Sequence, residues 1–266
     1  MDLQLTGKRA VVTGGSRGIG KAIARQLARE GVDVAIGARS VGPLEETAQE
    51  IARETGRKIV PIVVDTTNVD SIKHFVRNAA EALGGGVDIC VNSAARVGGA
   101  TGGIEEIDEI EILKDFEEKV IGYLRVAREC VPYMKANNWG RIINISGLAG
   151  RNPGTNLSGG SRNAATVNMT KALSNDLGKY GINVTAIYPG QTVTERTYDN
   201  LAPRARQENT SVDSLLAAQA ERSVIRHNVT AEDIAYVVTF VCSPLAISLT
   251  GEAIAVAGGQ SPDVHF

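Results

Sequence analysis

The chain has 266 residues, 43% of them hydrophobic, and a net charge of -2. A chain of this size can bury a large core, and its mixed charges give no basis for a nucleic-acid or anionic-membrane partner. It has no apolar run of membrane-spanning length and no apolar signal core near its start, so we expect a cytoplasmic protein with no membrane partner. Cys90 lies in an apolar run, which predicts a reduced core thiol and no metal site.

Short apolar runs and amphipathic stretches alternate along the chain without a linker. The first run is Arg9–Thr13, and residues 18–31 follow with apolar positions on one helical face and Gly31 as a stop. Further apolar runs cover 32–38, 58–65, 87–92, 140–146, 182–188 and 252–257, and helical stretches cover 43–56, 70–85, 113–137, 158–180 and 231–243. The alternation predicts one doubly wound, Rossmann-type α/β domain over residues 1–266. We expect a parallel sheet of about seven strands with helices on both faces.

A glycine-rich turn joins the first predicted strand to the first helix. It contains Gly14, Ser16, Arg17, Gly18, Ile19 and Gly20. Glycines permit a tight turn and a close approach of backbone N–H groups to a pyrophosphate, whose charge the helix N-terminus favours. An ordinary loop is the alternative interpretation, but the position between strand and helix favours dinucleotide binding.

The end of the second predicted strand indicates which dinucleotide binds. A cofactor with a free ribose 2′-OH usually meets an acidic residue there, whereas this chain has Arg39 and Ser40. Asp33 lies at the wrong end of the strand. Arg39 and Arg17 are suited to clamp a 2′-phosphate, although both could be solvated surface residues. We therefore predict NADP(H) in preference to NAD(H).

Several motifs in order resemble those of the short-chain dehydrogenase/reductase family over nearly the whole chain. They are "TGGSRGIG", "VVDTT", "NSAA", "GRIINISGLAG", "YPGQTVTE" and "TGEAIAVAGG". The resemblance implies a cofactor site that also includes Asp65, Thr66, Asn92, Ala94, Pro189, Gly190, Thr192 and Thr194. It further implies that Ser146 is the serine that hydrogen-bonds the substrate carbonyl.

The resemblance fails at the two side chains that perform the family's proton transfer. The family uses a tyrosine and a lysine one helical turn later, and an asparagine on the preceding long helix completes a proton relay. Here Gly159 and Asn163 occupy the tyrosine and lysine positions, and Lys119 occupies the asparagine position. No tyrosine lies between Ser146 and Tyr180, so no shift of the alignment restores the pair. Lysine and asparagine have thus changed places.

Two classes of function follow from this exchange. The first is an NADP(H)-dependent oxidoreductase that acts on a small carbonyl or alcohol substrate through a rebuilt proton relay of Ser146, Lys119 and Asn163. In it Lys119 reaches the nicotinamide ribose and serves as a proton donor, while Gly159 leaves an open space. The alternative is a catalytically silent NADP(H)-binding protein that acts as a sensor, scaffold or subunit. Halohydrin dehalogenases, a third comparison, keep the tyrosine and fill the glycine turn, which is the reverse of this sequence.

The segment 195–228 is predicted to be a substrate lid, because the family places its variable helices there. The family is commonly dimeric or tetrameric through its two long helices, which implies a homodimer or homotetramer. Val120, Leu124, Ala127 and Val131 form an apolar stripe on the first of these helices. The stripe either packs against a second copy or faces its own sheet.

Overall fold

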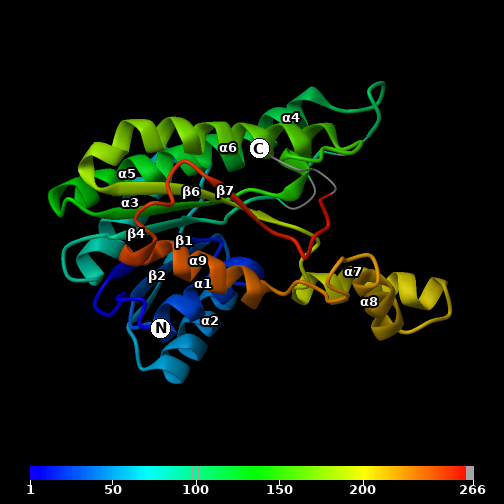
Figure 1. Ribbon diagram of the computed structural model, residues 1–266, viewed down its shortest axis with the longest axis horizontal. Coiled ribbons are helices and arrows are strands. Elements are labelled where there is room, and N and C mark those ends of the chain that lie inside the picture. Colours follow the sequence, from blue (N-terminus) through cyan, green and yellow to red (C-terminus); the bar gives the residue numbers. More distant parts are fainter. Residues whose placement is uncertain (97–98, 101, 262–266) are drawn as a thin grey trace.

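A parallel sheet forms the centre of the computed structural model, which describes residues 1–96, 99–100 and 102–261 (Figure 1). The described residues form seven strands: β1 (Arg9–Thr13), β2 (Asp33–Ala38), β3 (Ile59–Val63), β4 (Ile89–Asn92), β5 (Gly140–Ile145), β6 (Ile182–Pro189) and β7 (Ala253–Val256). Their order is β3-β2-β1-β4-β5-β6-β7, and every pair is parallel. The predicted doubly wound Rossmann-type fold is confirmed. The direction of winding reverses between β1 and β4, and ligands of such sheets bind at that point.

Helices cover both faces of the sheet (Figure 1). They are α1 (Gly18–Arg29), α2 (Val41–Thr55), α3 (Val69–Ala82), α4 (Glu109–Phe116), α5 (Gly122–Ala136), α6 (Leu157–Leu177), α7 (Glu195–Gln207), α8 (Val212–Ala220) and α9 (Ala231–Cys242). One hydrophobic cluster joins the sheet to α1, α2 and α9, and a second joins its other face to α3, α5 and the end of α6. Neighbouring residues of β1 enter different clusters, Val11 the second and Val12 the first. Both faces are therefore buried, which explains the continuous apolar runs.

A π-helical turn, Glu117–Ile121, connects α4 to α5, so the helical run from Glu109 to Ala136 is unbroken. It matches the helix predicted over 113–137 but begins earlier, because the Asp108 side chain accepts a hydrogen bond from the Ile110 amide and caps it. A π turn holds more residues per turn than an α-helix and therefore changes which side chains face the sheet. Lys119 lies within this turn and is buried.

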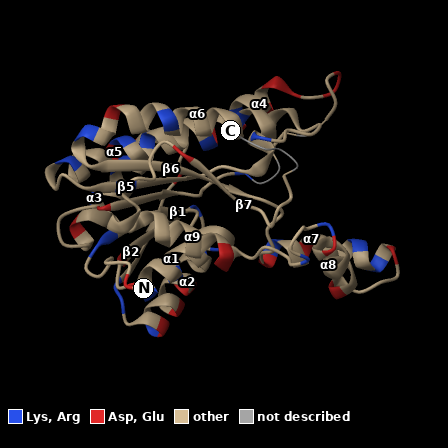
Figure 2. Cartoon of the chain, viewed as in Figure 1, with Lys and Arg blue, Asp and Glu red and all other residues tan. Residues whose placement is uncertain are grey.

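The predicted lid segment forms a pair of helices, α7 and α8, that projects from the body of the molecule (Figure 1). All residues of both helices are described, and among them Ala205 in α7 is the buried one. Residues of both charge signs lie along the pair (Figure 2). The closure of this segment over a substrate stays a prediction.

The apolar stripe on α5 lies at least partly against its own sheet. Ala127 belongs to the second hydrophobic cluster, and Val131 packs against that cluster. This favours the interpretation in which the stripe faces the sheet, and the oligomeric state stays a prediction. Cys90 is a buried free thiol, as predicted. Within the described part of the chain, no helix is long and apolar enough to span a membrane, and no group of His, Cys, Asp or Glu side chains could hold a metal ion.

Candidate functional site

A cavity of about 530 Å³ opens at the carboxyl ends of the parallel strands. Its walls come from the turn between β1 and α1, the ends of β2, β4, β5 and β6, the π turn and the first half of α6. This is the switch point of the sheet, where the topology places ligands of doubly wound folds.

The cavity brings together most residues that the sequence assigns to the site. The cofactor candidates that line it are Gly14, Ser16, Arg17, Gly18, Ile19, Gly20, Arg39, Ser40, Thr66, Ala94, Pro189, Gly190 and Thr194. All three catalytic candidates, Ser146, Lys119 and Asn163, line it as well. Residues from eight separate segments of the chain therefore share one cavity.

Three of the predicted cofactor-binding residues are not among the described residues that line the cavity, and their side chains form hydrogen bonds with other protein groups. Asp65 accepts hydrogen bonds from the Thr67 amide (2.9 Å) and hydroxyl (2.8 Å), and these bonds lower the pKa of its carboxyl group. Asn92 is buried and donates to the Asn144 side chain at 2.9 Å. The Thr192 hydroxyl donates to the Gly190 carbonyl at 3.1 Å. Their contact with a cofactor stays a prediction.

The glycine-rich turn needs glycine at two positions. Gly14 has φ of +70°, and a Cβ there would lie 2.9 Å from the Ala94 backbone nitrogen. A Cβ on Gly20 would lie 2.2 Å from the Gly14 carbonyl oxygen, closer than any real contact. The first turn of α1 and the end of β4 can approach only because both side chains are absent.

The cavity wall is strongly cationic. Its charged, described residues comprise six cations, Arg17, Arg39, Arg96, Lys119, Arg162 and Arg196, and two carboxylates, Glu118 and Glu195. Arg39 has 72% of its side chain exposed and lies 3.7 Å from Glu118, a weak surface pair. Arg39 and Arg17 are therefore accessible to an anion in the cavity.

Lys119 connects the three catalytic candidates. Its Nζ donates to the Asn163 side-chain oxygen at 2.7 Å and to the Ser146 carbonyl at 2.9 Å. Burial, and then the nearby positive charge of Arg162, lower the pKa of Lys119 to about 7. An amine in this state can hold or release a proton at neutral pH.

The Ser146 hydroxyl points toward the helix instead of lying free. It donates a hydrogen bond of 2.9 Å to the Asn163 carbonyl. The hydroxyl of Tyr123, a phenol among the described lining residues, donates to the Ile145 carbonyl at 3.1 Å, and burial raises its pKa. In this conformation Lys119 is therefore the proton donor best placed toward the cavity.

A buried ion pair that the sequence reasoning missed lies beside these residues. Arg162 and Asp115 are both buried, and their Nη1 and Oδ1 atoms lie 3.3 Å apart. The second Asp115 oxygen accepts hydrogen bonds from the Ala100 amide and the Ser158 hydroxyl. The signal in the sequence for a buried charge at this place was Arg162 itself, which directly precedes Asn163 in a predicted helix rich in small residues.

Comparison with known proteins adds to this geometry. The family model for short chain dehydrogenases matches residues 8–205. The chain belongs to the short-chain dehydrogenase family. It is 27% identical to the NADPH-dependent reductase BacG of Bacillus subtilis, over 97% of this chain and 99% of that protein. It is 34% identical to the short chain dehydrogenase mdpC of Emericella nidulans, over 97% of both chains.

Solved structures of other family members are also similar. The L-sorbose reductase of Gluconobacter frateurii, complexed with NADPH and L-sorbose, superposes with a TM-score of 0.94 at 28% identity, over 99% of this chain and 100% of that one. The 7α-hydroxysteroid dehydrogenase complexed with NADH and a bile acid gives 0.86 at 27% identity, over 99% of this chain and 98% of that one. The short-chain dehydrogenase described here is thus similar to oxidoreductases that bind small molecules with either nicotinamide cofactor.

Gly159, which the family resemblance places at the tyrosine position, lies against the cap of α6. A Cβ on Gly159 would lie 2.9 Å from the Asn156 side-chain amide. The same Asn156 side chain accepts a hydrogen bond of 2.7 Å from the Gly159 amide and caps α6. The helix cap therefore occupies the space at the first side-chain atom of position 159, and the open space at the more distant position of a phenol stays a prediction.

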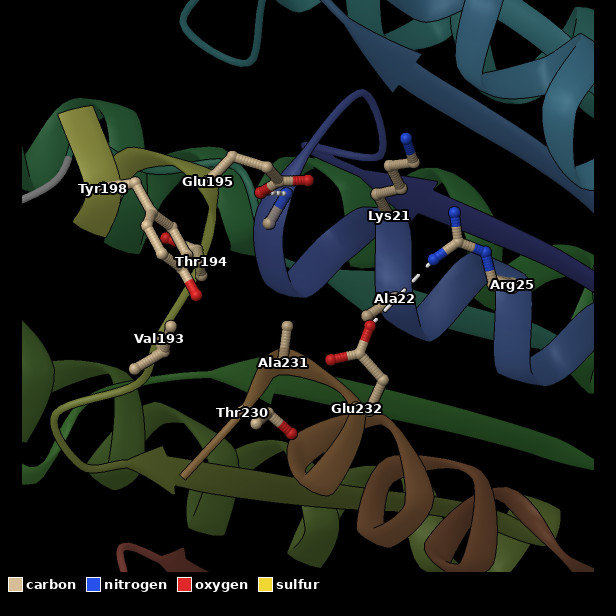
Figure 3. A pocket seen from close by; sticks show the side chains of 11 residues that line it. Lys21, Ala22, Arg25, Val193, Thr194, Glu195, Tyr198, Thr230, Ala231 and Glu232 are labelled. Carbon is tan, nitrogen blue, oxygen red and sulfur yellow. Dashed lines mark hydrogen bonds and ion pairs between the residues drawn. The ribbon is translucent and has the colours of Figure 1, made fainter. Parts of the chain in front are cut away.

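A second cavity of about 310 Å³ adjoins the glycine turn, between the first turns of α1, α7 and α9 (Figure 3). Glu195 points from the start of α7 toward the first turn of α1, and its carboxylate accepts a hydrogen bond of 3.1 Å from the Gly18 amide. A carboxylate at a helix N-terminus takes the place that a phosphate would favour. Glu195 is therefore a competitor for the anion-binding end of α1.

Replacing Glu195 with Gln is expected to tighten NADPH binding about two- to fivefold, because one charge at the helix N-terminus contributes about 0.3–1 kcal/mol. Cofactor-fluorescence titration of wild type and variant measures the change. Asp199→Asn, the same neutralisation at an exposed position of α7, is the control and should leave the affinity unchanged. Equal affinities for wild type and Glu195→Gln would show that the carboxylate does not compete.

Proposed function

We propose that this short-chain dehydrogenase is an NADP(H)-dependent oxidoreductase of carbonyl and alcohol substrates in which Lys119 replaces the missing tyrosine and lysine. The observation that carries the proposal is the position of the Lys119 amine. It lies at the wall of the cavity and is held by Asn163 and by the Ser146 carbonyl. The exchange of lysine and asparagine seen in the sequence therefore keeps an amine at the site.

The residues of the cavity fit a phosphorylated dinucleotide. The glycine turn and the N-terminus of α1 suit a pyrophosphate, and Arg17 and Arg39 suit a 2′-phosphate. Five arginines and one partly protonated lysine against two carboxylates give the described cavity wall a net positive charge, which suits the negative charge of NADPH. When bound, the cofactor supplies or accepts a hydride. The NADPH dependence of the relative BacG and the NADPH bound in the L-sorbose reductase structure support the preference for NADP(H).

The proposed role of Lys119 is to give a proton to the substrate oxygen during reduction and to take it back during oxidation. With a pKa lowered to about 7 by burial, the amine can both give and take a proton near neutral pH, which suits transfer in both directions. Asn163 accepts from Nζ and so fixes the direction of the amine. Ser146 contributes its carbonyl to the same purpose.

One observation favours the alternative of a catalytically silent NADP(H)-binding protein. The Ser146 hydroxyl donates to the Asn163 carbonyl, so it must turn before it can donate to a substrate. A protein of this kind would bind the cofactor as a sensor, scaffold or subunit without turnover.

Cofactor titration followed by a substrate screen separates the two functions. The titration uses NADPH and NADH, and the screen offers sugar ketones, steroid ketones and acyl thioester ketones with NADPH and the matching alcohols with NADP⁺. Tight NADPH binding with turnover of one class is expected. Tight binding without turnover would favour the silent protein, and no binding of either cofactor would contradict both.

The matched control for the titration is Gly20→Ala. Its Cβ would lie 2.2 Å from the Gly14 carbonyl oxygen, so the turn that receives the pyrophosphate must distort. If this variant no longer binds the cofactor while its circular dichroism is unchanged, the cofactor that gives the fluorescence signal binds in the cavity next to the glycine turn.

A further inference from the structure

The side-chain amide of Asn163 is held in one orientation. Its oxygen Oδ1 accepts a hydrogen bond of 2.7 Å from the Lys119 Nζ. A protonated lysine amine donates and cannot accept, so it selects the oxygen of the amide and not the nitrogen. The amide nitrogen of Asn163, Nδ2, is therefore the end that does not face Lys119.

The nitrogen Nδ2 of Asn163 has two protons to donate and can be reached from the cavity. Among the described residues no group accepts a hydrogen bond from it, and it is not one of the enclosed side-chain atoms that lack a partner. Asn163 and Gly147 both line the large cavity. A donor that is neither bonded nor enclosed faces the space of this cavity.

Gly147 leaves the room that Nδ2 needs. A Cβ on Gly147 would lie 2.7 Å from Nδ2 and 3.3 Å from Cγ of Asn163, and the shorter distance is closer than real Cβ contacts. The backbone itself does not require glycine here, because φ of Gly147 is 174°, which is extended. The missing side chain therefore matters for the position of the Asn163 amide.

The hydroxyl groups next to Lys119 already donate to the protein. The Ser146 hydroxyl donates to the backbone carbonyl of Asn163 at 2.9 Å, and the Tyr123 hydroxyl donates to the Ile145 carbonyl at 3.1 Å. Reduction of a carbonyl group places negative charge on its oxygen, and a positioned hydrogen-bond donor stabilises that charge. Of the Ser146, Tyr123 and Asn163 side chains, Asn163 is the one with protons that are not yet donated.

We propose that Asn163 is a catalytic residue whose Nδ2 donates a hydrogen bond to the carbonyl oxygen of the substrate. This rests on the proposed function, because it needs a carbonyl substrate and Lys119 as the proton donor. During reduction the carbonyl carbon gains the hydride that NADPH loses, and the π electron pair of the C=O bond moves onto oxygen. The oxygen then takes the Lys119 proton, which leaves an alcohol, a neutral amine and NADP⁺. Nδ2 stabilises the charge on oxygen until the proton arrives.

Nuclear magnetic resonance of isotope-labelled asparagine side chains tests the proposal without turnover. The Asn163 amide signal is assigned by its absence in Asn163→Asp. Protein saturated with NADP⁺, which cannot reduce a ketone, is titrated with the ketone that the substrate screen selects, or with cyclohexanone if it selects none. We expect the Nδ2 signals of Asn163 to shift. Those of Asn138, an exposed asparagine that is not among the described lining residues, should stay in place.

Two variants separate donation to the substrate from the support of Lys119. Asn163→Asp keeps an acceptor for the Lys119 amine and removes both amide protons, so kcat should fall about 10²–10³-fold. Rates are compared at the pH optimum of each protein, because a carboxylate beside Lys119 raises the pKa of the amine. Gly147→Ala keeps Asn163 but displaces its amide, and should also lower kcat. Gly178→Ala at the end of α6, where a Cβ meets nothing within 4 Å, is the control and should leave kcat unchanged.

An Asn163 signal that stays in place throughout the titration would overturn the proposal, and so would a wild-type kcat in Asn163→Asp at its own pH optimum. If Asn163→Asp does not fold, Gly147→Ala decides, because a kcat equal to that of Gly178→Ala would overturn the proposal as well. Failure of the proposed function is seen separately, as wild-type protein that binds no NADPH or reduces no ketone. A shift of the Asn163 signal in such a protein would still support donation to the carbonyl oxygen.

Discussion

Lys119→Met is expected to lower turnover with NADPH about 10²–10⁴-fold, the typical loss when one positioned general acid is removed. The methionine keeps most of the volume of the stem but has no proton to transfer and no donor for Asn163 or for the Ser146 carbonyl. We also expect weaker NADPH binding, because the amine is lost from the cavity wall. Steady-state rates and cofactor titration measure the two effects.

Thermal unfolding distinguishes loss of function from loss of fold. The variant leaves the buried Asn163 side-chain oxygen and the Ser146 carbonyl without the Lys119 donor, so we expect the melting temperature to fall by a few degrees while the protein stays folded. Lys171→Met, an exposed lysine of α6, is the matched control and should change neither turnover nor affinity. Turnover and affinity like those of wild type in Lys119→Met would refute the role of Lys119.

Arg39→Ala is expected to reduce the preference for NADPH over NADH roughly ten- to hundredfold. A charge-assisted hydrogen bond to a phosphate contributes about 1.5–3 kcal/mol. NADH has no 2′-phosphate, so the loss of Arg39 should weaken the binding of NADPH alone. The exposed guanidinium and its loose pairing with Glu118, at 3.7 Å, leave it available to the cofactor. Parallel titrations with both cofactors give the ratio.

Arg53→Ala serves as the control for Arg39→Ala. Arg53 is an exposed arginine of α2 that bonds to the Gln49 carbonyl of its own helix and is not among the described lining residues of the cavity. Its removal changes the net charge equally without touching the site. A ratio that changes as little in Arg39→Ala as in Arg53→Ala would assign the preference to other residues.

The sheet was predictable because both of its faces are buried. Strands such as β5 and β6 are buried along their whole length, and their apolar runs are easy to recognise. The glycine turn was predictable for a different reason. Gly14 and Gly20 are required by close backbone contacts, so their spacing survives as a local pattern.

The catalytic region was predictable only in part. The exchange of Lys119 and Asn163 was visible in the sequence, and the structure places the two side chains 2.7 Å apart. The ion pair of Arg162 and Asp115 joins two helices, and the local pattern around Arg162 gives no indication of its partner. The same holds for Asn156, whose side chain fills the space beside Gly159 through a helix cap.

The pair of helices α7 and α8 has a consequence for how the molecule opens. The structure describes every residue of α7 and α8, and Ala205 is the buried one among them. The two helices therefore bury little apolar surface against the rest of the fold. Segments of this kind open locally with free energies near zero, far below that of global unfolding. Backbone amides of residues 195–220 should thus exchange with solvent long before those of the sheet. We expect a protease to cut the chain first between α7 and α8, at residues 208–211.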